Sequence, residues 1–362
     1  MNKVVVALIP EPGAAVELRE VSEPELEENS ALLEVELSEV CGTDVHLQQG
    51  RLAGVPYPLV PGHVSVGRLG KIRGRLSDVD GKLFAEGDRV TFLDVHRTCN
   101  ACWHCLVAKA TTRCPERKVY GITYGLADGL AGGWAQKIYL KPGTRLIRLD
   151  GADTETFMAG GCALPTALHA VERAGVEIGD TVLVLGSGPV GLSAVIFARM
   201  RGALRVLCVG SPAARLETAR LVGAASTLDI ETNDEESRLS WVLEQTDGRG
   251  ADVCIEATGA PIAVRQAMRY TRDAGRVCVV GQYTDHGEVS FNPHLDLNRK
   301  HLDVRGCWGS DFSHVYRGAR VMADAERSRP WSLMKLERYG LADANRALAD
   351  VASGRVVKAL ID

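Results

Sequence analysis

A glycine-rich turn between an apolar strand and a helix limits the fold of this chain more than any other feature. The segment TVLVLGSGPVGLSAVIFARMRGA carries the turn at residues 186–191. Three further apolar segments, RVLCVG, DVCIEATG and RVCVVGQ, follow it with helical patterns between them. Apolar strands that alternate with helices are typical of a parallel, doubly wound sheet with helices on both faces. We therefore expect an α/β domain over residues 161–304.

The turn matches the pattern that binds the pyrophosphate of a dinucleotide. In that pattern the first glycine allows the tight turn, the second lets the backbone approach the phosphates, and the third lets the helix pack against the strand. The N–H groups at the start of the helix then face the phosphates. An alternative interpretation is a glycine-rich turn of purely structural value. The candidate cofactor-binding residues in the turn are Gly186, Gly188, Pro189, Val190 and Gly191.

The end of the second strand indicates which dinucleotide the chain would bind. In NAD sites an acidic residue usually stands there and accepts a hydrogen bond from the ribose 2′-hydroxyl. This chain has Gly210 and Ser211 instead, with Arg215 four residues further on. A hydroxyl and a guanidinium without a carboxylate favour the 2′-phosphate of NADP, so we predict a preference for NADP(H) over NAD(H). Alternatively, Arg215 is a solvated helix residue and the cofactor is NAD without its acidic partner.

The regions on either side of this domain have a different pattern. Residues 1–160 form short strand-like segments broken by glycine and proline, which predicts a β-rich, barrel-like domain. After residue 305 the alternation gives way to helical segments and a short terminal strand, VVKALI. Residues 305–362 would complete the first domain. A chain of 362 residues is long enough for two domains of ordinary size.

Composition and charge exclude several classes of function. Hydrophobic residues make up 46 % of the chain and charged residues 24 %, the balance of a soluble globular protein. A formal net charge of −4 gives no field that would attract nucleic acid or an anionic membrane. No apolar run approaches the roughly 20 residues that span a bilayer, and the apolar stretch at the N-terminus is too short for a signal peptide. We expect a cytoplasmic protein that acts on a small molecule, with no nucleic-acid or membrane partner.

Four of the ten cysteines are clustered in a polar segment, which indicates a metal site rather than a disulfide framework. They follow the spacing C-x2-C-x2-C-x8-C. Four thiolates at such spacing can close a tetrahedron around zinc and leave no open coordination position. Disulfides or thiols without metal are the alternative. The predicted ligands of this structural zinc are Cys99, Cys102, Cys105 and Cys114.

A second set of metal-binding residue types is spread over the first 162 residues. VCGTDVH contributes Cys41, VPGHVSVG contributes His63, and GGCALPT contributes Cys162. Two thiolates and one imidazole make a catalytic zinc site with a fourth position open for water or substrate. Taken singly, each residue could belong to the core, a turn or a buried helix, so the prediction depends on their occurring together. VCGTDVH also contains Thr43, Asp44 and His46.

The chain resembles the zinc-containing medium-chain alcohol dehydrogenases over nearly its whole length. The resemblance covers, in order, CGTD-x-H, PGH, EGDRV, the four-cysteine segment, GGWAQ, C-x-x-x-T, GSGPVG and the pair Gly223-Ala224. It implies a GroES-like catalytic domain, a Rossmann cofactor domain and a homodimer or homotetramer. It also implies hydride transfer between a nicotinamide cofactor and a small alcohol or carbonyl substrate, with one catalytic and one structural zinc per chain.

The resemblance also assigns roles to residues of this chain. The family's catalytic-zinc ligands correspond to the cysteine–histidine–cysteine set, and its structural-zinc ligands to the four clustered cysteines. Its proton relay corresponds to Thr43 and His46. The carboxylate that orients the histidine ligand in the family corresponds to Asp44.

One residue departs from the family pattern. The family commonly has Gly-His-Glu where this chain reads Gly62-His63-Val64. That glutamate lies beside the zinc in relatives and can bind it or assist ligand exchange, and Val64 can do neither.

Two rival functions remain: a zinc-independent enoyl- or quinone-type reductase, and a non-catalytic redox sensor that binds the cofactor, which Val64 keeps open. The cysteine–histidine–cysteine set argues against the first, and Thr43 and His46 argue against the second. Large side chains that would line a substrate pocket, or simply belong to the core, are Leu47, Trp103, Tyr120, Tyr124, Trp308 and Phe312.

Overall fold

The computed structural model describes residues 2–362, which fold into two compact units. The first unit contains the chain up to Cys162 together with Asp311–Ser328 and Lys335–Asp362. The second contains Ala163–Ser310 and Arg329–Met334. The boundaries expected from the sequence, 160/161 and 304/305, therefore differ from these by two and six residues. None of the helices in residues 2–362 is long and apolar enough to cross a membrane.

The segment Arg329–Met334 lies outside the α/β pattern in the sequence but belongs to the second unit. Its Trp331 is fully buried, and the indole N–H donates a hydrogen bond to the Ser193 hydroxyl at 3.1 Å. The same indole packs edge-on against the ring of Phe197, with 5.1 Å between the centroids. One buried aromatic side chain thus accounts for the return of the chain to this unit.

A seven-stranded sheet forms the centre of the first unit. The strands of this unit are β1 (Lys3–Leu8), β2 (Glu17–Ser22), β3 (Ser30–Val40), β4 (Ser65–Arg73), β5 (Arg89–Phe92), β6 (Val95–Arg97), β7 (Lys118–Val119), β8 (Lys137–Leu140), β9 (Leu146–Arg148), β16 (Leu336–Tyr339) and β17 (Lys358–Ile361). The order in the sheet is β16-β17-β3-β4-β5-β9, with β8 also paired to β3. Only β16 and β17 are parallel; the other pairs in this sheet are antiparallel. Two-stranded sheets β1–β2 and β6–β7 complete the strands.

Helices of the first unit are short. They are α1 (Gly42–Gln48), α2 (Trp103–Leu106), α3 (Thr154–Gly160), α9 (Phe312–Met322) and α11 (Ala344–Ala352), and α10 (Ala325–Ser332) contains the boundary between the units. Single 3-10 turns occupy Thr111–Arg113, Leu126–Asp128 and Leu341–Asp343.

Strand β3 is buried on both faces. Leu32 belongs to a hydrophobic cluster that includes Leu348 of α11, whereas Ala31 and Leu33 belong to a second cluster that includes Phe92 of β5. Side chains alternate between the faces of a strand, so each face of β3 has its own core. The strand ends at Val40, directly before Cys41, so the first candidate ligand lies at the edge of the seven-stranded sheet.

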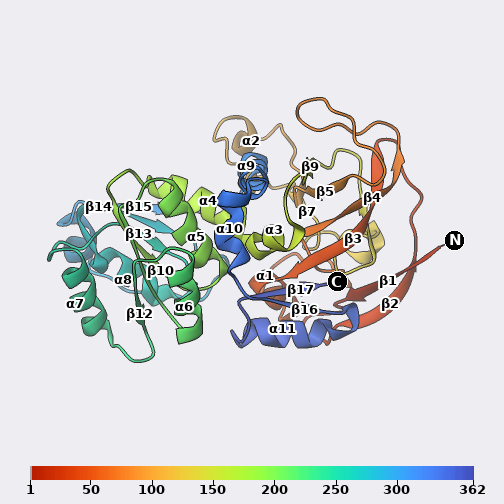
Figure 1. Ribbon diagram of the computed structural model, residues 1–362. Helices are drawn as coiled ribbons and strands as arrows, with labels where there is room; N and C mark the ends of the chain where they lie inside the picture. The colour runs from red at the N-terminus through yellow and green to blue at the C-terminus, as the bar shows by residue number, and fades with distance from the viewer. Residues whose placement is uncertain (1) are drawn as a thin grey trace. The chain divides into compact units, whose positions relative to one another are not determined.

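The second unit contains the expected doubly wound sheet (Figure 1). Its strands are β10 (Thr181–Leu185), β11 (Arg205–Gly210), β12 (Ser226–Asp229), β13 (Ala251–Glu256), β14 (Thr271–Val279) and β15 (Asp303–Gly306). Its helices are α4 (Ala163–Ala174), α5 (Pro189–Met200), α6 (Ala213–Leu221), α7 (Glu235–Gln245) and α8 (Pro261–Tyr270), with a π-helical turn at Pro293–Asn298. All strand pairs are parallel in the order β12-β11-β10-β13-β14-β15.

Helices cover both faces of this sheet: α4, α5 and α6 lie on one side, and α7 and α8 on the other (Figure 1). Leu183 and Leu185 of β10 pack with Ala263 and Ala267 of α8. From β10 the strand order runs to β11 and β12 in one direction, and from β13 it runs to β14 and β15 in the other. The topological switch point, at which the order reverses, therefore lies between β10 and β13. Ligands of doubly wound sheets bind outside the carboxyl ends of the strands at this point. The α/β fold predicted from the sequence is confirmed.

Candidate functional site

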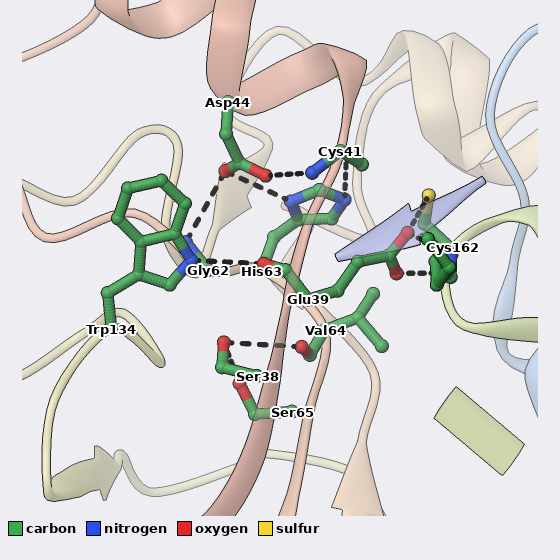
Figure 2. Close-up of polar contacts among 11 residues, drawn as sticks. Ser38, Glu39, Cys41, Asp44, Gly62, His63, Val64, Ser65, Trp134 and Cys162 are labelled. Atoms are coloured by element: carbon green, nitrogen blue, oxygen red, sulfur yellow. Dashed lines mark hydrogen bonds and ion pairs between the residues drawn. The ribbon is translucent and has the colours of Figure 1, made fainter. Parts of the chain in front are cut away.

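Three candidate metal ligands converge in the first unit. The ligand atoms of Cys41, His63 and Cys162 all lie within 4.8 Å of one another (Figure 2). The Cys41 sulfur is 3.9 Å from Nε2 of His63. Zinc bonds of about 2.0–2.3 Å in a tetrahedron place ligand atoms roughly 3.3–3.8 Å apart. The two thiols and the imidazole therefore fit one zinc ion after a small inward movement, and they leave a fourth position without a cysteine or histidine.

Asp44 connects the segments that carry two of these ligands. Its side chain is fully buried, and Oδ2 accepts the backbone N–H of Cys41 at 2.8 Å, which caps the start of α1. Oδ1 accepts the N–H of Gly62 at 3.5 Å and lies 3.9 Å from Nδ1 of His63. The carboxylate thus fixes the backbones on both sides of the site and faces the imidazole at ion-pair distance (Figure 2).

The charges of this site favour a thiolate at Cys41 and oppose one at Cys162 in the absence of a bound cation. A hydrogen bond from Cys162 lowers the pKa of Cys41 to about 7. The same contact with Cys41, together with burial, raises the pKa of Cys162. Burial disfavours a charged imidazole, but the negative charges of Cys41 and Asp44 outweigh it and raise the pKa of His63. Two sulfur donors and one nitrogen donor of this kind are the ligands that zinc prefers.

A buried ion pair beside Cys162 was not apparent from the sequence. Glu39 and Lys358 are each 1 % exposed, and the Lys358 ammonium pairs with Oε1 of Glu39. Oε2 of Glu39 accepts the backbone N–H of Cys162 at 2.6 Å, and the Cys162 thiol donates to Oε1 at 3.2 Å (Figure 2). The available signal was Lys358 in the apolar segment VVKALI, since charges are rarely fully buried unless paired. Glu39 is one of three glutamates on β3 and was not distinguished from the other two by sequence.

The four clustered cysteines also converge. Their sulfurs lie within 4.8 Å of one another, with 3.6 Å between Cys99 and Cys114 and 3.6 Å between Cys102 and Cys105. A ZnS4 tetrahedron with bonds of about 2.3 Å has edges of roughly 3.8 Å, so the set fits zinc. Backbone N–H groups of Ala101 and Cys102 lower the pKa of Cys99 to about 7. Burial raises the pKa of Cys105 to about 12, because it disfavours the thiolate. A bound metal cation would stabilise the thiolate and remove this penalty.

Thr43 and His46 lie on α1 directly after Cys41. They are three residues apart, which places them on neighbouring positions of one helix face. Both are half-buried. Each is therefore close in sequence to a candidate ligand and retains access to solvent.

The large side chains considered for a substrate pocket divide into different environments. Trp103 is 63 % exposed on α2, and Trp308 stacks on Tyr283 in the second unit with 5.7 Å between the ring centroids. Phe312 packs against a buried cluster of the first unit. The remaining three belong to the cores: Leu47, Tyr120 and Tyr124.

The glycine-rich turn of the second unit has the geometry that a dinucleotide requires. Gly186 has φ +111°, and a Cβ there would lie 2.7 Å from the carbonyl oxygen of Ala257. A Cβ at Gly191 would lie 1.9 Å from the carbonyl oxygen of Gly186, so α5 packs closely on the turn. Gly188, the N-cap of α5, faces open space. The open approach at Gly188, beside the first N–H groups of a twelve-residue helix, fits a pyrophosphate.

The end of β11 is shaped by a serine of this turn. The Ser187 hydroxyl donates to the carbonyl of Ser211 at 2.9 Å, and a Cβ at Gly210 would lie 2.6 Å from the Ser187 oxygen. Arg215 is half-buried in the first turn of α6, where burial lowers its pKa. The Arg215 side chain is thus partly shielded from solvent.

Glu256 is a second buried acid that the sequence did not single out. It is fully buried at the carboxyl end of β13, beside the switch point. Its carboxylate accepts N–H groups of Thr258 at 2.6 Å, Gly259 at 3.1 Å and Gly281 at 3.2 Å. It thus fixes the loops after β13 and β14, next to the glycine-rich turn.

Comparisons with known proteins show which family the chain is similar to. Residues 27–151 match the family described as "Alcohol dehydrogenase GroES-like domain", and residues 189–324 match "Zinc-binding dehydrogenase". The chain is 32 % identical to 5-exo-hydroxycamphor dehydrogenase of Pseudomonas putida, over 92 % of this chain and 91 % of that protein.

Two solved structures have the same fold. An alcohol dehydrogenase from Thermotoga maritima is similar with a TM-score of 0.94 and 30 % identity, over 100 % of this chain and 99 % of that one. A putative zinc-binding dehydrogenase from Sinorhizobium meliloti 1021, bound to NADP, has a TM-score of 0.85 and 26 % identity over the same shares. On these similarities, and with two zinc-type ligand sets in its first unit, the chain belongs to the zinc-containing medium-chain alcohol dehydrogenases.

Proposed function

We propose that this enzyme transfers a hydride between NADP(H) and a small alcohol or carbonyl substrate, at a zinc site formed by Cys41, His63 and Cys162. The observation that carries the proposal is the convergence of these three ligand atoms within 4.8 Å, with one coordination position left over. A catalytic zinc keeps such a position for substrate, whereas a structural zinc does not. Zinc bound there supplies a Lewis acid that polarises the substrate oxygen.

The protein's own residues provide the path for the proton. Thr43 follows the ligand Cys41 by two residues, and its hydroxyl accepts the proton of the substrate hydroxyl while it releases its own proton toward His46. His46, on the same face of α1 and half-buried, passes the proton to solvent. Asp44 holds the backbones of Cys41 and Gly62 and keeps His63 in place.

The four-cysteine site has a different role. Its sulfurs complete a tetrahedron by themselves, so a zinc held by Cys99, Cys102, Cys105 and Cys114 has no position for substrate. We assign it to the stability of the segment that contains α2. Each chain would thus hold two zinc ions.

The preference for NADP rests on Ser211 and Arg215 at the end of β11. A hydroxyl and a half-buried guanidinium, at a strand end that carries Gly210 in place of an acidic residue, suit a 2′-phosphate. The NADP-bound structure from Sinorhizobium meliloti, with 26 % identity, supports this choice. The doubly wound sheet presents its binding edge at the same strands.

The test is reduction of NADP⁺ or NAD⁺ by the zinc-loaded enzyme with a panel of alcohols. Because one relative is named a hydroxycamphor dehydrogenase, the panel includes bicyclic secondary alcohols beside linear alcohols and polyols. We expect alcohol-dependent reduction that is lost in His63→Ala. Reduction of activated alkenes without any alcohol oxidation would favour the zinc-independent reductase, and cofactor binding without turnover would favour the redox sensor.

A further inference from the structure

The buried pair of Glu39 and Lys358 lies against Cys162 in the first unit. Both side chains are 1 % exposed. Taking two charges out of water is unfavourable, and their mutual attraction offsets this only in good geometry with further hydrogen bonds. The contacts of this pair show what the charges hold in place.

The sheet register determines where the two side chains lie. Ser38 pairs with Ser65 across β3 and β4, and their hydroxyls hydrogen-bond to each other at 3.0 Å. The next residue, Glu39, donates its N–H to the carbonyl of Val64 at 3.0 Å. Since side chains alternate along a strand, Glu39 and Val64 emerge together on the opposite face from the two serines. The Glu39 carboxylate thus stands directly opposite Val64 on the neighbouring chain segment (Figure 2). Val64 is the position at which the family commonly has a glutamate.

Strand β17 brings the cation to the same face. Leu360 pairs with Glu39, so Lys358, two residues earlier, is the diagonal neighbour of Glu39. On one side of Glu39, the segment paired with β3 thus supplies the apolar side chain of Val64. On the other side, β17 supplies the ammonium group of Lys358.

The pair holds the turn that carries Cys162 at both of its ends. Glu39 accepts the N–H of Cys162 at 2.6 Å, and the Lys358 ammonium donates to the carbonyl of Gly160 at 3.4 Å. Between these contacts, Gly161 has φ +49°, and a Cβ there would lie 2.2 Å from the Glu39 carboxylate and 2.6 Å from the Lys358 nitrogen. The turn therefore packs directly on the two charges.

These contacts do not depend on the proton of the Cys162 thiol. When Cys162 binds a metal as thiolate, the thiol proton is lost, but the backbone N–H and the Lys358 ammonium still hold Glu39. Lys358 also compensates a carboxylate that would otherwise face two thiolates in a buried site. Loss of one partner alone would leave an unpaired buried charge, which costs more than loss of both.

We propose that Glu39 and Lys358 are positioning residues that hold Cys162 toward Cys41 and His63, and that they set how tightly this site retains zinc. The inference rests on the zinc site of the proposed function. It concerns the retention of the metal, so its test does not require turnover.

The experiment measures zinc release from the two-zinc protein to a chelating dye. The four-cysteine zinc serves as an internal reference in the same molecule. Lys358→Met leaves Glu39 unpaired beside Cys162, and we expect release of one zinc to become about 10- to 100-fold faster, the usual effect of losing a partner of a metal ligand. Glu39→Gln should also speed release of this zinc, and Lys358→Arg should restore retention.

A double variant and a spectroscopic signature separate positioning from a general loss of stability. Glu39→Gln/Lys358→Met should release zinc more slowly than Lys358→Met alone, because no unpaired charge remains. After cobalt substitution, the thiolate-to-cobalt absorption of the single variants should shift relative to the parent. Glu36→Gln is the matched control, because Glu36 lies on the same strand and pairs with Arg89 away from the ligands. It should change neither quantity.

Unchanged zinc release and an unchanged cobalt spectrum in Glu39→Gln and Lys358→Met would overturn this inference. If Lys358→Met fails to fold, Glu39→Gln and Lys358→Arg decide the matter by the same two measurements. A parent protein that holds only the four-cysteine zinc would overturn the proposed function itself. A parent with two zinc ions and unaffected variants would overturn only the role of the pair.

Discussion

The hydroxyl of Ser187 donates a hydrogen bond to the carbonyl of Ser211 at 2.9 Å and ties the glycine-rich turn to the end of β11. This contact explains why residue 210 is glycine, since a Cβ there would lie 2.6 Å from the Ser187 oxygen and 2.9 Å from its backbone nitrogen. The close contact with Ser187 is thus enough to explain why position 210 is a glycine, whichever cofactor binds. The argument for NADP therefore depends on Ser211 and Arg215.

Arg215→Ala should weaken the use of NADP(H) and leave that of NAD(H) nearly unchanged. A charge-assisted hydrogen bond from Arg215 to the 2′-phosphate contributes about 1.5–3 kcal/mol. That corresponds to roughly 10- to 100-fold in kcat/KM for NADP(H). The measurement is kcat/KM with both cofactors in the parent and the variant. Arg220→Ala, an exposed arginine on the same helix, is the control. A parent that already prefers NAD(H) would contradict the prediction.

Gly210→Asp alone should impair both cofactors, because the new side chain collides with Ser187. In Ser187→Gly/Gly210→Asp the hydroxyl and its Cβ are gone, and the close contact that remains is the backbone nitrogen of residue 187 at 2.9 Å, which requires a small shift of the turn. The carboxylate can then accept a hydrogen bond from a ribose 2′-hydroxyl and repel a 2′-phosphate. We expect this double variant to prefer NAD(H) by about tenfold or more. Ser187→Gly by itself controls for the lost bond to Ser211. An equal preference in the double variant and in Ser187→Gly would show that residue 210 does not face the ribose.

The sequence predicted the parts of this structure that depend on local pattern. Continuous apolar strands such as TVLVL indicate burial on both faces, and the parallel sheet of the second unit follows from them. The spacing of the four clustered cysteines likewise fits a single site, because all four lie in one short segment.

The pair of Glu39 and Lys358 illustrates what the sequence could not reveal. The two residues are 319 positions apart and meet only because β17 pairs with β3. Periodicity indicates which face of a strand is buried, but it does not name the neighbouring strand or the register. For the same reason, the return of Trp331 to the second unit was not predicted.

Loss of a ligand should have different consequences at the two metal sites. His63→Ala should reduce the metal content from about two zinc ions to one and lower kcat/KM about a thousandfold or more, since the Lewis acid contributes several kcal/mol. Its midpoint of thermal unfolding should stay near that of the parent. Cys102→Ala should also lose one zinc, but its main effect should be a loss of stability of about 4 kcal/mol or more. Metal analysis and thermal unfolding measure both effects. Full activity in zinc-depleted His63→Ala would contradict the assignment.

The proton path on α1 predicts variants that retain zinc and lose turnover. Thr43→Val removes the hydroxyl that accepts the substrate proton but nearly keeps the volume of the side chain. A positioned acid–base group contributes about 10²- to 10⁴-fold, so we expect kcat to fall by about 10²-fold or more with two zinc ions still bound. His46→Gln should lower kcat less, because solvent reaches this half-buried position and can replace the imidazole as proton acceptor. Added imidazole should restore part of the activity of the His46 variant and none of that of Thr43→Val. Unchanged kcat in Thr43→Val would place the proton path elsewhere.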